Sequence, residues 1–244
     1  MKGMIFAAGY GTRLKPWTDT HPKALVPVAG RPALETVIDK LMQAGITDIV
    51  VNTHHFAEQI ESFLASTPRF SSVSISHEPV LLDTGGGLRK VLAHFGDEPV
   101  LIHNADIATD FPLVDFMARY DETRPDAMLL TAERPTSRFL IFGKDARLRG
   151  WTRVEGRCMP AEVPGVAADE SARAFGGVHI VSPSLYGELE CYAPADTPFS
   201  ITDFYRAVCG SHRILKYDIP TGSAWFDVGK PATLEAAEQY FAQE

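Results

Sequence analysis

The stretch Met4-Ile5-Phe6-Ala7-Ala8-Gly9-Tyr10-Gly11-Thr12-Arg13-Leu14 joins a short apolar run to a glycine-rich turn that carries a cation. The apolar residues 4–8 predict a buried strand, and the glycines allow a tight turn whose backbone N–H groups can approach an anion. Leu14 stands where a dinucleotide-binding loop has its third glycine, Pro16 blocks an immediate helix, and no Walker A lysine follows. Taken alone, a phosphate site and a plain structural turn explain the stretch equally well.

Two cations close to this turn favour the phosphate site. Arg13 lies within the turn, and Lys23 follows in the segment 21–28. Most lysines and arginines are solvated surface residues, and that is the simplest interpretation of each one alone. A fixed loop that presents both cations beside backbone donors suits a triphosphate better.

Strand and helix patterns alternate through the rest of the first half of the chain. Apolar residues recur at helical spacing over residues 34–42, and Gly45 ends that pattern. We expect further strands at 49–52, 73–76 and 99–103, and helices at 57–64 and after Gly87. Such alternation is typical of a parallel sheet with helices on both faces, whose ligands bind beyond the carboxyl ends of the strands.

From residue 127 the pattern changes to strands with little helix between them. We expect strands at 128–132, 139–142, 148–152 and 177–181, followed by helices at 202–208 and 232–241. The predicted fold is a single α/β domain over residues 1–244, with a Rossmann-like mixed, mainly parallel sheet flanked by helices. The second half completes that sheet and adds a lid or a platform for a second substrate.

The composition excludes several classes of protein. A chain of 244 residues with 45% hydrophobic residues can bury a sizeable core, and its formal net charge of −8 argues against a general nucleic-acid binder. Its three cysteines are far apart and form no metal motif. No apolar run approaches the ~20 residues of a membrane span, so a soluble cytoplasmic protein without nucleic-acid or membrane partners is expected.

Three segments resemble, with matching spacing, the signature of the sugar-phosphate nucleotidyltransferases. They are Ala7-Ala8-Gly9-Tyr10-Gly11-Thr12-Arg13-Leu14-Lys15-Pro16-Trp17-Thr18, Pro22-Lys23 and Pro27-Val28-Ala29-Gly30-Arg31-Pro32. The resemblance implies that residues 1–126 bind the nucleotide and residues 127–244 the sugar phosphate. It also implies that the backbone of Ala8, Gly9, Gly11 and Thr12 holds the triphosphate, with Arg13 and Lys23 as the catalytic cations.

Two aspartates are the candidate ligands of a metal ion. Transfer between two phosphorylated anions requires charge neutralisation, and Mg²⁺ prefers one or two carboxylates together with phosphate oxygens. Asp106 ends the strand predicted at 99–103, and Asp227 lies in Trp225-Phe226-Asp227-Val228-Gly229. Either aspartate alone is more simply a cap or turn residue. The first resembles the family's Asn-Gly-Asp, with Ala105 in place of glycine, and the second its Trp-x-Asp-x-Gly, so the resemblance implies Mg²⁺ as cofactor.

The resemblance also implies residues for base and sugar recognition. Glu78 falls where relatives place a Gln or Glu that reads the base, and Gly85 and Gly86 belong to a glycine turn that embraces it. A helix N-terminus capped by Thr84 is the structural alternative for that turn. Gly177 resembles the glycine that lines the sugar-phosphate pocket. Glu162-Val163-Pro164 resembles a Glu-Lys-Pro sugar-binding motif of the family, with Val163 in place of the lysine.

The leading hypothesis is an enzyme that joins a nucleoside triphosphate to a sugar 1-phosphate with release of pyrophosphate, acting as a monomer or a homodimer. The glycine turn at residues 84–87 resembles most the N-acetylmuramate-1-phosphate uridylyltransferases, which would place the product in cell-wall nucleotide-sugar synthesis. Mannose-1-phosphate guanylyltransferase is the second reading, and a non-catalytic nucleotide-sugar-binding regulator is a third. A Rossmann-type oxidoreductase is disfavoured by the form of the loop.

Overall fold

The centre of the fold is β1 (Lys2–Phe6), a strand whose residues Gly3, Met4 and Ile5 are fully buried. It pairs in parallel with β4 (Ile49–Thr53) on one side and with β6 (Val100–Asn104) on the other. The computed structural model describes residues 1–243, and β1 lies there inside a nine-stranded sheet of order β10-β9-β11-β6-β1-β4-β5, to which β8 and β12 are attached through β11.

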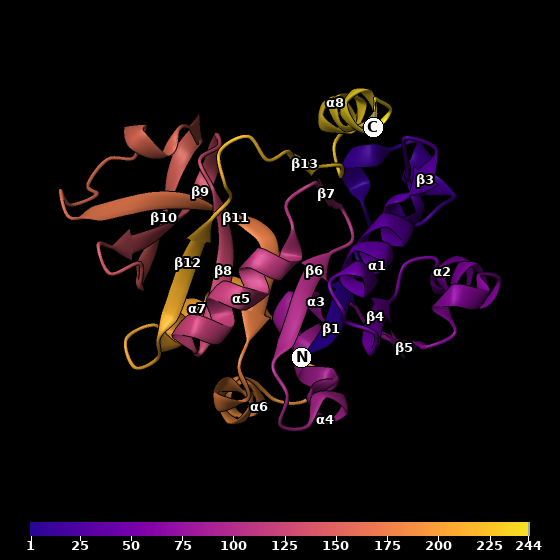
Figure 1. The fold of residues 1–244 in the computed structure, drawn as a ribbon, viewed down its shortest axis with the longest axis horizontal. Helices are drawn as coiled ribbons and strands as arrows, with labels where there is room; N and C mark the ends of the chain where they lie inside the picture. Colours follow the sequence, from indigo (N-terminus) through magenta and orange to yellow (C-terminus); the bar gives the residue numbers. More distant parts are fainter. Residues whose placement is uncertain (244) are drawn as a thin grey trace.

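The sheet changes character along the chain (Figure 1). Its first half is parallel from β6 to β5 (Val73–His77), as the alternating pattern predicts. The second half is largely antiparallel, because β11 (Glu170–Val181) pairs against β6, β8 (Ala127–Ala132) and β9 (Thr136–Gly143). The outer strands are β10 (Leu148–Cys158), antiparallel to β9, and β12 (Ile214–Asp218), parallel to β8. The predicted class, a mixed α/β sheet flanked by helices, is confirmed.

Helices cover both faces and create two cores. One core packs α1 (Ala33–Gln43), α2 (Ala57–Ala65) and α5 (Leu113–Thr123) on the sheet, and includes Leu34, Ile60 and Phe116. The other packs the opposite face against α3 (Asp83–Lys90), α4 (Leu92–Phe95), α6 (Tyr186–Tyr192) and α7 (Ile201–Val208). The last helix is α8 (Pro231–Phe241). Among residues 1–243, no helix has the length and apolar character needed to cross a bilayer.

Several boundaries differ from the sequence prediction for physical reasons. β1 ends at Phe6 instead of residue 8, because the N–H of Ala7 donates to Asn52 Oδ1 (2.7 Å) and leaves the strand pairing. α3 begins at Asp83 instead of after Gly87, so its glycines lie inside the helix. β11 begins at Glu170 instead of residue 177, and its pairing register shifts between Phe175 and His179.

Among the strands that escaped prediction, two very short ones position the site. β7 (Ile107–Thr109) and β13 (Trp225–Asp227) form an antiparallel pair that places Asp227 opposite Ile107. Figure 1 shows this pair above the main sheet, with α8 beside the segment that carries β2 (Pro27–Val28) and its partner β3 (Arg31–Pro32). The pairing joins segments more than a hundred residues apart.

Two buried histidines lie on opposite faces of the central sheet. His103 Nδ1 lies 2.8 Å from the carbonyl oxygen of Asn104, and neither ring nitrogen of His179 has a hydrogen-bond partner within residues 1–243. Burial lowers the pKa of His103 to about 4, and burial with the nearby His103 lowers the pKa of His179 to about 3. The ring of His179 packs against the rings of Phe6, Phe175 and Tyr205, so it behaves as a neutral aromatic core residue.

We predict an acid-labile fold. Because the folded pKa of His179 lies below the ordinary value of ~6.5, the unfolded state binds more protons below that pH, and stability falls as pH drops from 6.5 towards the folded pKa. His179→Phe should reduce the slope of the unfolding free energy by up to ~1.4 kcal/mol per pH unit over that window. Urea denaturation between pH 7 and pH 4.5 measures it, and the exposed His77→Gln is the control. An unchanged slope in His179→Phe would contradict the assignment.

Candidate active site

The glycine loop, residues 8–12, follows β1 directly. Gly11 has a left-handed backbone with φ of 65°, and a Cβ there would lie 2.7 Å from Lys23 Cβ. Both the conformation and the contact require glycine at this position. Thr18 Oγ1 fixes the turn by donating to the carbonyl oxygen of Gly11 (2.9 Å). The loop ends in a short 3-10 helix over residues 12–14, on which Thr12 and Arg13 are exposed to solvent.

Lys23 connects this loop to the first aspartate. It begins a 3-10 helix (Lys23–Leu25) directly after the buried Pro22, so its side chain starts from a fixed point beside Gly11. Its ammonium Nζ lies 2.6 Å from Asp106 Oδ2. Asp106 itself is only 8% exposed and sits between β6 and β7, at the carboxyl end of the strand beside β1.

Asp227, at the end of β13, is held by two cations. Lys230 Nζ lies 2.6 Å and Arg13 Nη1 3.3 Å from its Oδ2, and the N–H of Gly229 donates to its Oδ1 (3.1 Å). Burial raises the pKa of this carboxyl, but the hydrogen bond from Lys230 and the charge of Arg13 outweigh it, so the net pKa is lowered. Asp227 is therefore ionised at neutral pH.

The surroundings of Gly229 show how closely the predicted residues converge. A Cβ added to Gly229 would lie 2.9 Å from Asp227 Oδ1, 3.0 Å from Asp106 Oδ2 and 3.0 Å from Arg13 Nη2. The two carboxylate oxygens are therefore no more than about 6 Å apart. The structure brings Arg13, Lys23, Asp106 and Asp227 to one place, although 83 residues separate Lys23 from Asp106 and 214 separate Arg13 from Asp227.

A cavity of about 140 Å³ opens beside this cluster. Its walls come from the glycine loop, the ends of β1, β4 and β6, and the start of α3: Phe6, Ala8, Gly9, Lys23, Asn52, Leu81, Asp83, Thr84, Asn104 and Asp106. Asn52 and Asn104 were not singled out by the sequence analysis as ligands. Both end strands of the parallel half, and a polar residue at the end of a buried strand was the signal that could have found them.

Glu78 lies beneath the cavity and does not face it. The carboxylate is fully buried, Oε1 accepts from Asn52 Nδ2 (2.7 Å), and Oε2 accepts from the N–H of Leu82 (2.9 Å). In this arrangement Glu78 positions Asn52 and the loop before α3. Neither carboxylate oxygen of Glu78 is exposed, so the predicted contact with the base is not available in this structure.

The glycines of α3 serve helix packing. A Cβ on Gly85 would lie 2.9 Å from the carbonyl oxygen of Phe199 and closer still to its ring, and one on Gly86 would lie 2.8 Å from the carbonyl oxygen of Thr197. Thr84 Oγ1 accepts from the N–H of Ile201 (3.0 Å) instead of capping its own helix. The structure thus places Gly85 and Gly86 against residues 197–199, with Asp83 and Thr84 on the cavity wall.

The two predicted sugar-phosphate residues lie in different places. Gly177 has φ of 76°, and a Cβ there would lie 3.0 Å from Asn104 Nδ2, so it borders the cavity wall. Glu162 is exposed and accepts the N–H of Met159 (2.6 Å) in a 3-10 helix, residues 160–162. The neighbouring Val163 packs in a small separate core with Phe139 and Ala172, so the segment 160–164 belongs to the packing of β9 and β11.

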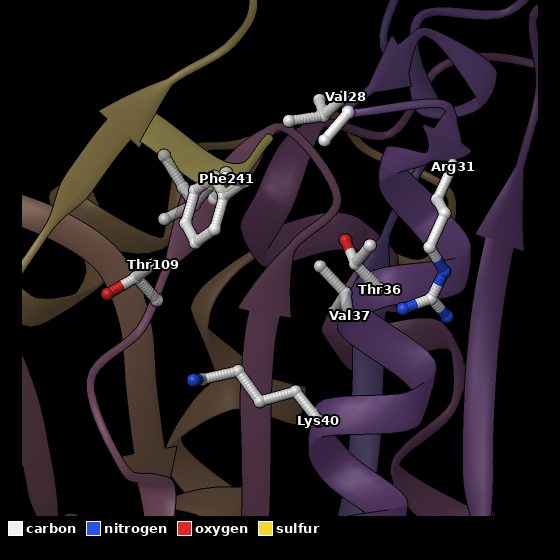
Figure 2. Close-up of a pocket in the computed structure, with 10 residues that line it drawn as sticks. Val28, Arg31, Thr36, Val37, Lys40, Thr109 and Phe241 are labelled. Carbon is white, nitrogen blue, oxygen red and sulfur yellow. The ribbon is translucent and has the colours of Figure 1, made fainter. Parts of the chain in front are cut away.

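A second cavity of about 280 Å³ lies between α1, β7 and the end of α8 (Figure 2). Figure 2 shows the Lys40 side chain crossing below the cavity, with Val28 above and the Phe241 ring at its side. None of the predicted site residues lines it. The chemistry-bearing groups therefore gather on the glycine-loop side of β7.

The fold and the site define a class of protein: an α/β enzyme whose cations and carboxylates suit phosphorylated substrates at the carboxyl edge of a parallel sheet. A family model described as nucleotidyl transferase matches residues 2–146. The chain is 32% identical to an N-acetylmuramate alpha-1-phosphate uridylyltransferase of Caulobacter vibrioides, over 98% of this chain and 96% of that protein. It is 30% identical to a mannose-1-phosphate guanyltransferase of Gibberella zeae over 95% of this chain, but spans only 61% of that protein.

Solved structures agree in fold. UDP-glucose pyrophosphorylase complexed with UDP-glucose superposes with a TM-score of 0.78 at 20% identity, covering all of both chains. HddC from Yersinia pseudotuberculosis complexed with GMP-PN gives 0.75 at 21% identity over 98% of this chain and 99% of that one. The chain therefore belongs to the nucleotidyl transferase family, among the sugar-phosphate nucleotidyltransferases.

The packing role of the glycine run is testable. Gly85→Ala should destabilise the protein by ~1–3 kcal/mol, because the added methyl group overpacks α3 against Phe199. Gly187→Ala in α6 is the matched control, since a Cβ there meets nothing within 4 Å. Urea unfolding of both variants measures the difference, and equal stability of the two would refute the packing role.

Proposed function

We propose that this enzyme condenses UTP with N-acetylmuramate 1-phosphate, or a related hexose 1-phosphate, to give a UDP-sugar and pyrophosphate. The main observation in support of this transfer reaction is that Asp106, Asp227 and Arg13 converge on one point beside the glycine loop. The relative from Caulobacter vibrioides, matched over nearly the whole of both chains, supports the choice of uridylyl transfer to the muramic sugar. The reaction would supply a nucleotide-sugar for cell-wall synthesis in the cytoplasm.

The donor set of the site fits Mg²⁺. Asp106 and Asp227 supply two carboxylates, and within residues 1–243 no group of three or more His, Cys, Asp or Glu side chains forms a complete metal cage. Mg²⁺ binds through one or two carboxylates and takes its remaining ligands from phosphate oxygens and water. When bound, the ion neutralises phosphate charge during the transfer. Asp106 and Asp227 would hold it, exchanging their contacts with Lys23 and Lys230.

The chain's own residues then position the reacting groups. The backbone of residues 8–12 receives the triphosphate, Lys23 faces the α-phosphate, and Arg13 faces the departing pyrophosphate. An oxygen of the sugar phosphate attacks the α-phosphorus in line, forming a new P–O bond as the bond to the β-phosphate oxygen breaks. The attacking phosphate is already ionised at neutral pH, so no general base is required.

Mannose-1-phosphate guanylyl transfer is the second candidate, because the relative from Gibberella zeae matches 95% of this chain at 30% identity. A regulatory protein without turnover is the third. The assembly of both carboxylates with Arg13 and Lys23 favours catalysis over that reading.

The metal assignment predicts that Asp106→Ala and Asp227→Ala each lower kcat at least ~10³-fold, because each removes a ligand and leaves an unbalanced cation in the site. Pyrophosphate release with MgCl₂ varied measures the loss. Asp97→Ala, an exposed carboxylate on the loop before β6, should retain wild-type turnover. Near wild-type activity with Mg²⁺ in either active-site variant would overturn the assignment.

A substrate panel tests the proposed reaction itself. UTP, GTP, dTTP and CTP are each mixed with N-acetylmuramate 1-phosphate, N-acetylglucosamine 1-phosphate, glucose 1-phosphate and mannose 1-phosphate, and pyrophosphate is followed. UTP with N-acetylmuramate 1-phosphate should give the highest kcat/KM. A preference for GTP with mannose 1-phosphate would establish the second candidate. Nucleotide binding without pyrophosphate release from any pair would favour the regulatory reading.

A further inference from the structure

Arg134 is a partly buried arginine just beyond β8, held in place without a carboxylate. Its guanidinium carbon lies 4.4 Å from the centre of the Trp225 ring, and Nη2 donates to the carbonyl oxygen of Phe175 (3.0 Å). Its Nε is buried and makes no hydrogen bond to any residue from 1 to 243. Burial lowers the pKa of this guanidinium, opposed by the negative charge of Asp227, and an arginine remains charged in such a site.

Three other cations, close to the two aspartates, are balanced by acids, whereas Arg157, whose charge also acts on Arg134, is exposed and donates to the carbonyl oxygen of Pro135 (2.9 Å). Arg13 and Lys230 pair with Asp227, and Lys23 pairs with Asp106. In the cavity that Arg134 also lines, Arg173 pairs with Glu133 and with Asp218, each at 2.9 Å. Arg134 forms no ion pair with any residue that the structure describes. It therefore contributes a positive charge that the folded chain leaves open to an incoming anion.

The position of Arg134 places this charge beside the reaction. Trp225 and Asp227 are two residues apart in β13, and alternate residues of a strand point to the same face. Arg134 stacks on Trp225, so it lies on the face that carries Asp227. The Trp225 ring is itself fixed, because its Nε1 donates to the carbonyl oxygen of Gly176 (2.8 Å).

A cavity of about 480 Å³ adjoins Arg134 and Trp225. It is bounded by the end of β8 and by the segment 218–225, which leads into β13. A monosaccharide is smaller than this space, so a sugar ring can enter it while a group attached to the ring reaches Arg134. Val163, which stands where the resembled Glu-Lys-Pro motif has its lysine, is 7% exposed and packs in the separate core, so that segment supplies no cation to this cavity.

The geometry points to Arg134 as the residue that binds the phosphate of the sugar 1-phosphate, with the sugar ring in the adjoining cavity. This inference rests on the proposed function, which requires a second phosphate next to Asp227. A guanidinium presents five N–H donors in a planar fork, and one of them is engaged by Phe175. Stacking on the indole holds the plane of the fork before substrate arrives, which suits bidentate binding of a phosphate.

The test compares Arg134→Gln and Arg134→Lys with the wild-type enzyme. The matched control is Arg138→Gln, which removes an exposed cation from the adjoining strand β9. Two readouts are used: KM for each substrate in the pyrophosphate assay, and the Kd of N-acetylmuramate 1-phosphate and glucose 1-phosphate by calorimetric titration. Thermal melting checks that each variant is folded. The titration measures sugar-phosphate binding even if the proposed turnover were absent, so failure of the inference is distinguishable from failure of the proposed function.

Arg134→Gln should raise the Kd and the KM for both sugar phosphates ~10–100-fold, the value of one or two charge-assisted hydrogen bonds, and leave the KM for UTP within about twofold. Arg134→Lys should give Kd and KM values between those of Arg134→Gln and the wild type, because an ammonium restores the positive charge but not the planar set of guanidinium donors. The control should bind like the wild type. An unchanged Kd for the sugar phosphates in a folded Arg134→Gln would overturn the inference. An effect confined to N-acetylmuramate 1-phosphate would also overturn it. Arg134 would then bind the carboxylate of N-acetylmuramate, which glucose 1-phosphate lacks, and not the phosphate that both share.

Discussion

The pairing of β7 with β13 is the constraint on which the site depends. Asp106 reaches the edge of the main sheet through β6, but Asp227 comes from the end of the chain and has no place in that sheet. A ladder of three residue pairs, ending at Asp227 opposite Ile107, sets the second carboxylate beside the first. The N–H of Val228 adds a hydrogen bond to the carbonyl oxygen of Asp106 (2.8 Å), so the backbone itself fixes the spacing.

Two carboxylates at this spacing repel one another, and the chain offsets the repulsion with its own cations. Lys23, Arg13 and Lys230 occupy positions close to the acids that a metal ion and phosphate groups would otherwise take. The two carboxylates thereby have cationic partners within the folded chain itself. In the proposed reaction, binding would be an exchange of partners: a metal ion held by the two carboxylates would release these cations to contact phosphate oxygens, so no charge would be left without a partner.

Local signals in the sequence predicted the parallel half of the fold and the glycine loop, because strand, turn and helix there are encoded within a few neighbouring residues. The resemblance of short motifs led to Asp106 and Asp227, and their meeting is a geometric result that no local pattern contains.

β7 and β13 escaped prediction because strands of three residues carry no measurable periodicity. The glycines of α3 were misread as a turn, since a helix tolerates three glycines only where the packing of another segment demands them. Glu78 shows the same limit: a charged residue after a strand predicts exposure, whereas its partners Asn52 and Leu82 hold it inside.

The same limit explains why Arg134 carries no signal in the sequence. Its significance comes from Trp225 beneath it, Phe175 beside it and the absence of an acid among the described residues around it, and these contacts span about ninety positions of chain. They meet where β11 turns at Gly176 and Gly177, the point at which the antiparallel half of the sheet joins the parallel half. The parallel half supplies one wall of the site, built from the ends of its strands, and this is the wall we propose for the nucleotide. The junction supplies a separate wall, made of the bend in β11, the Trp225 indole and the Arg134 guanidinium. If this wall binds the sugar phosphate, as we propose, changes in it would alter the sugar side of the site without moving the strand ends of the other wall.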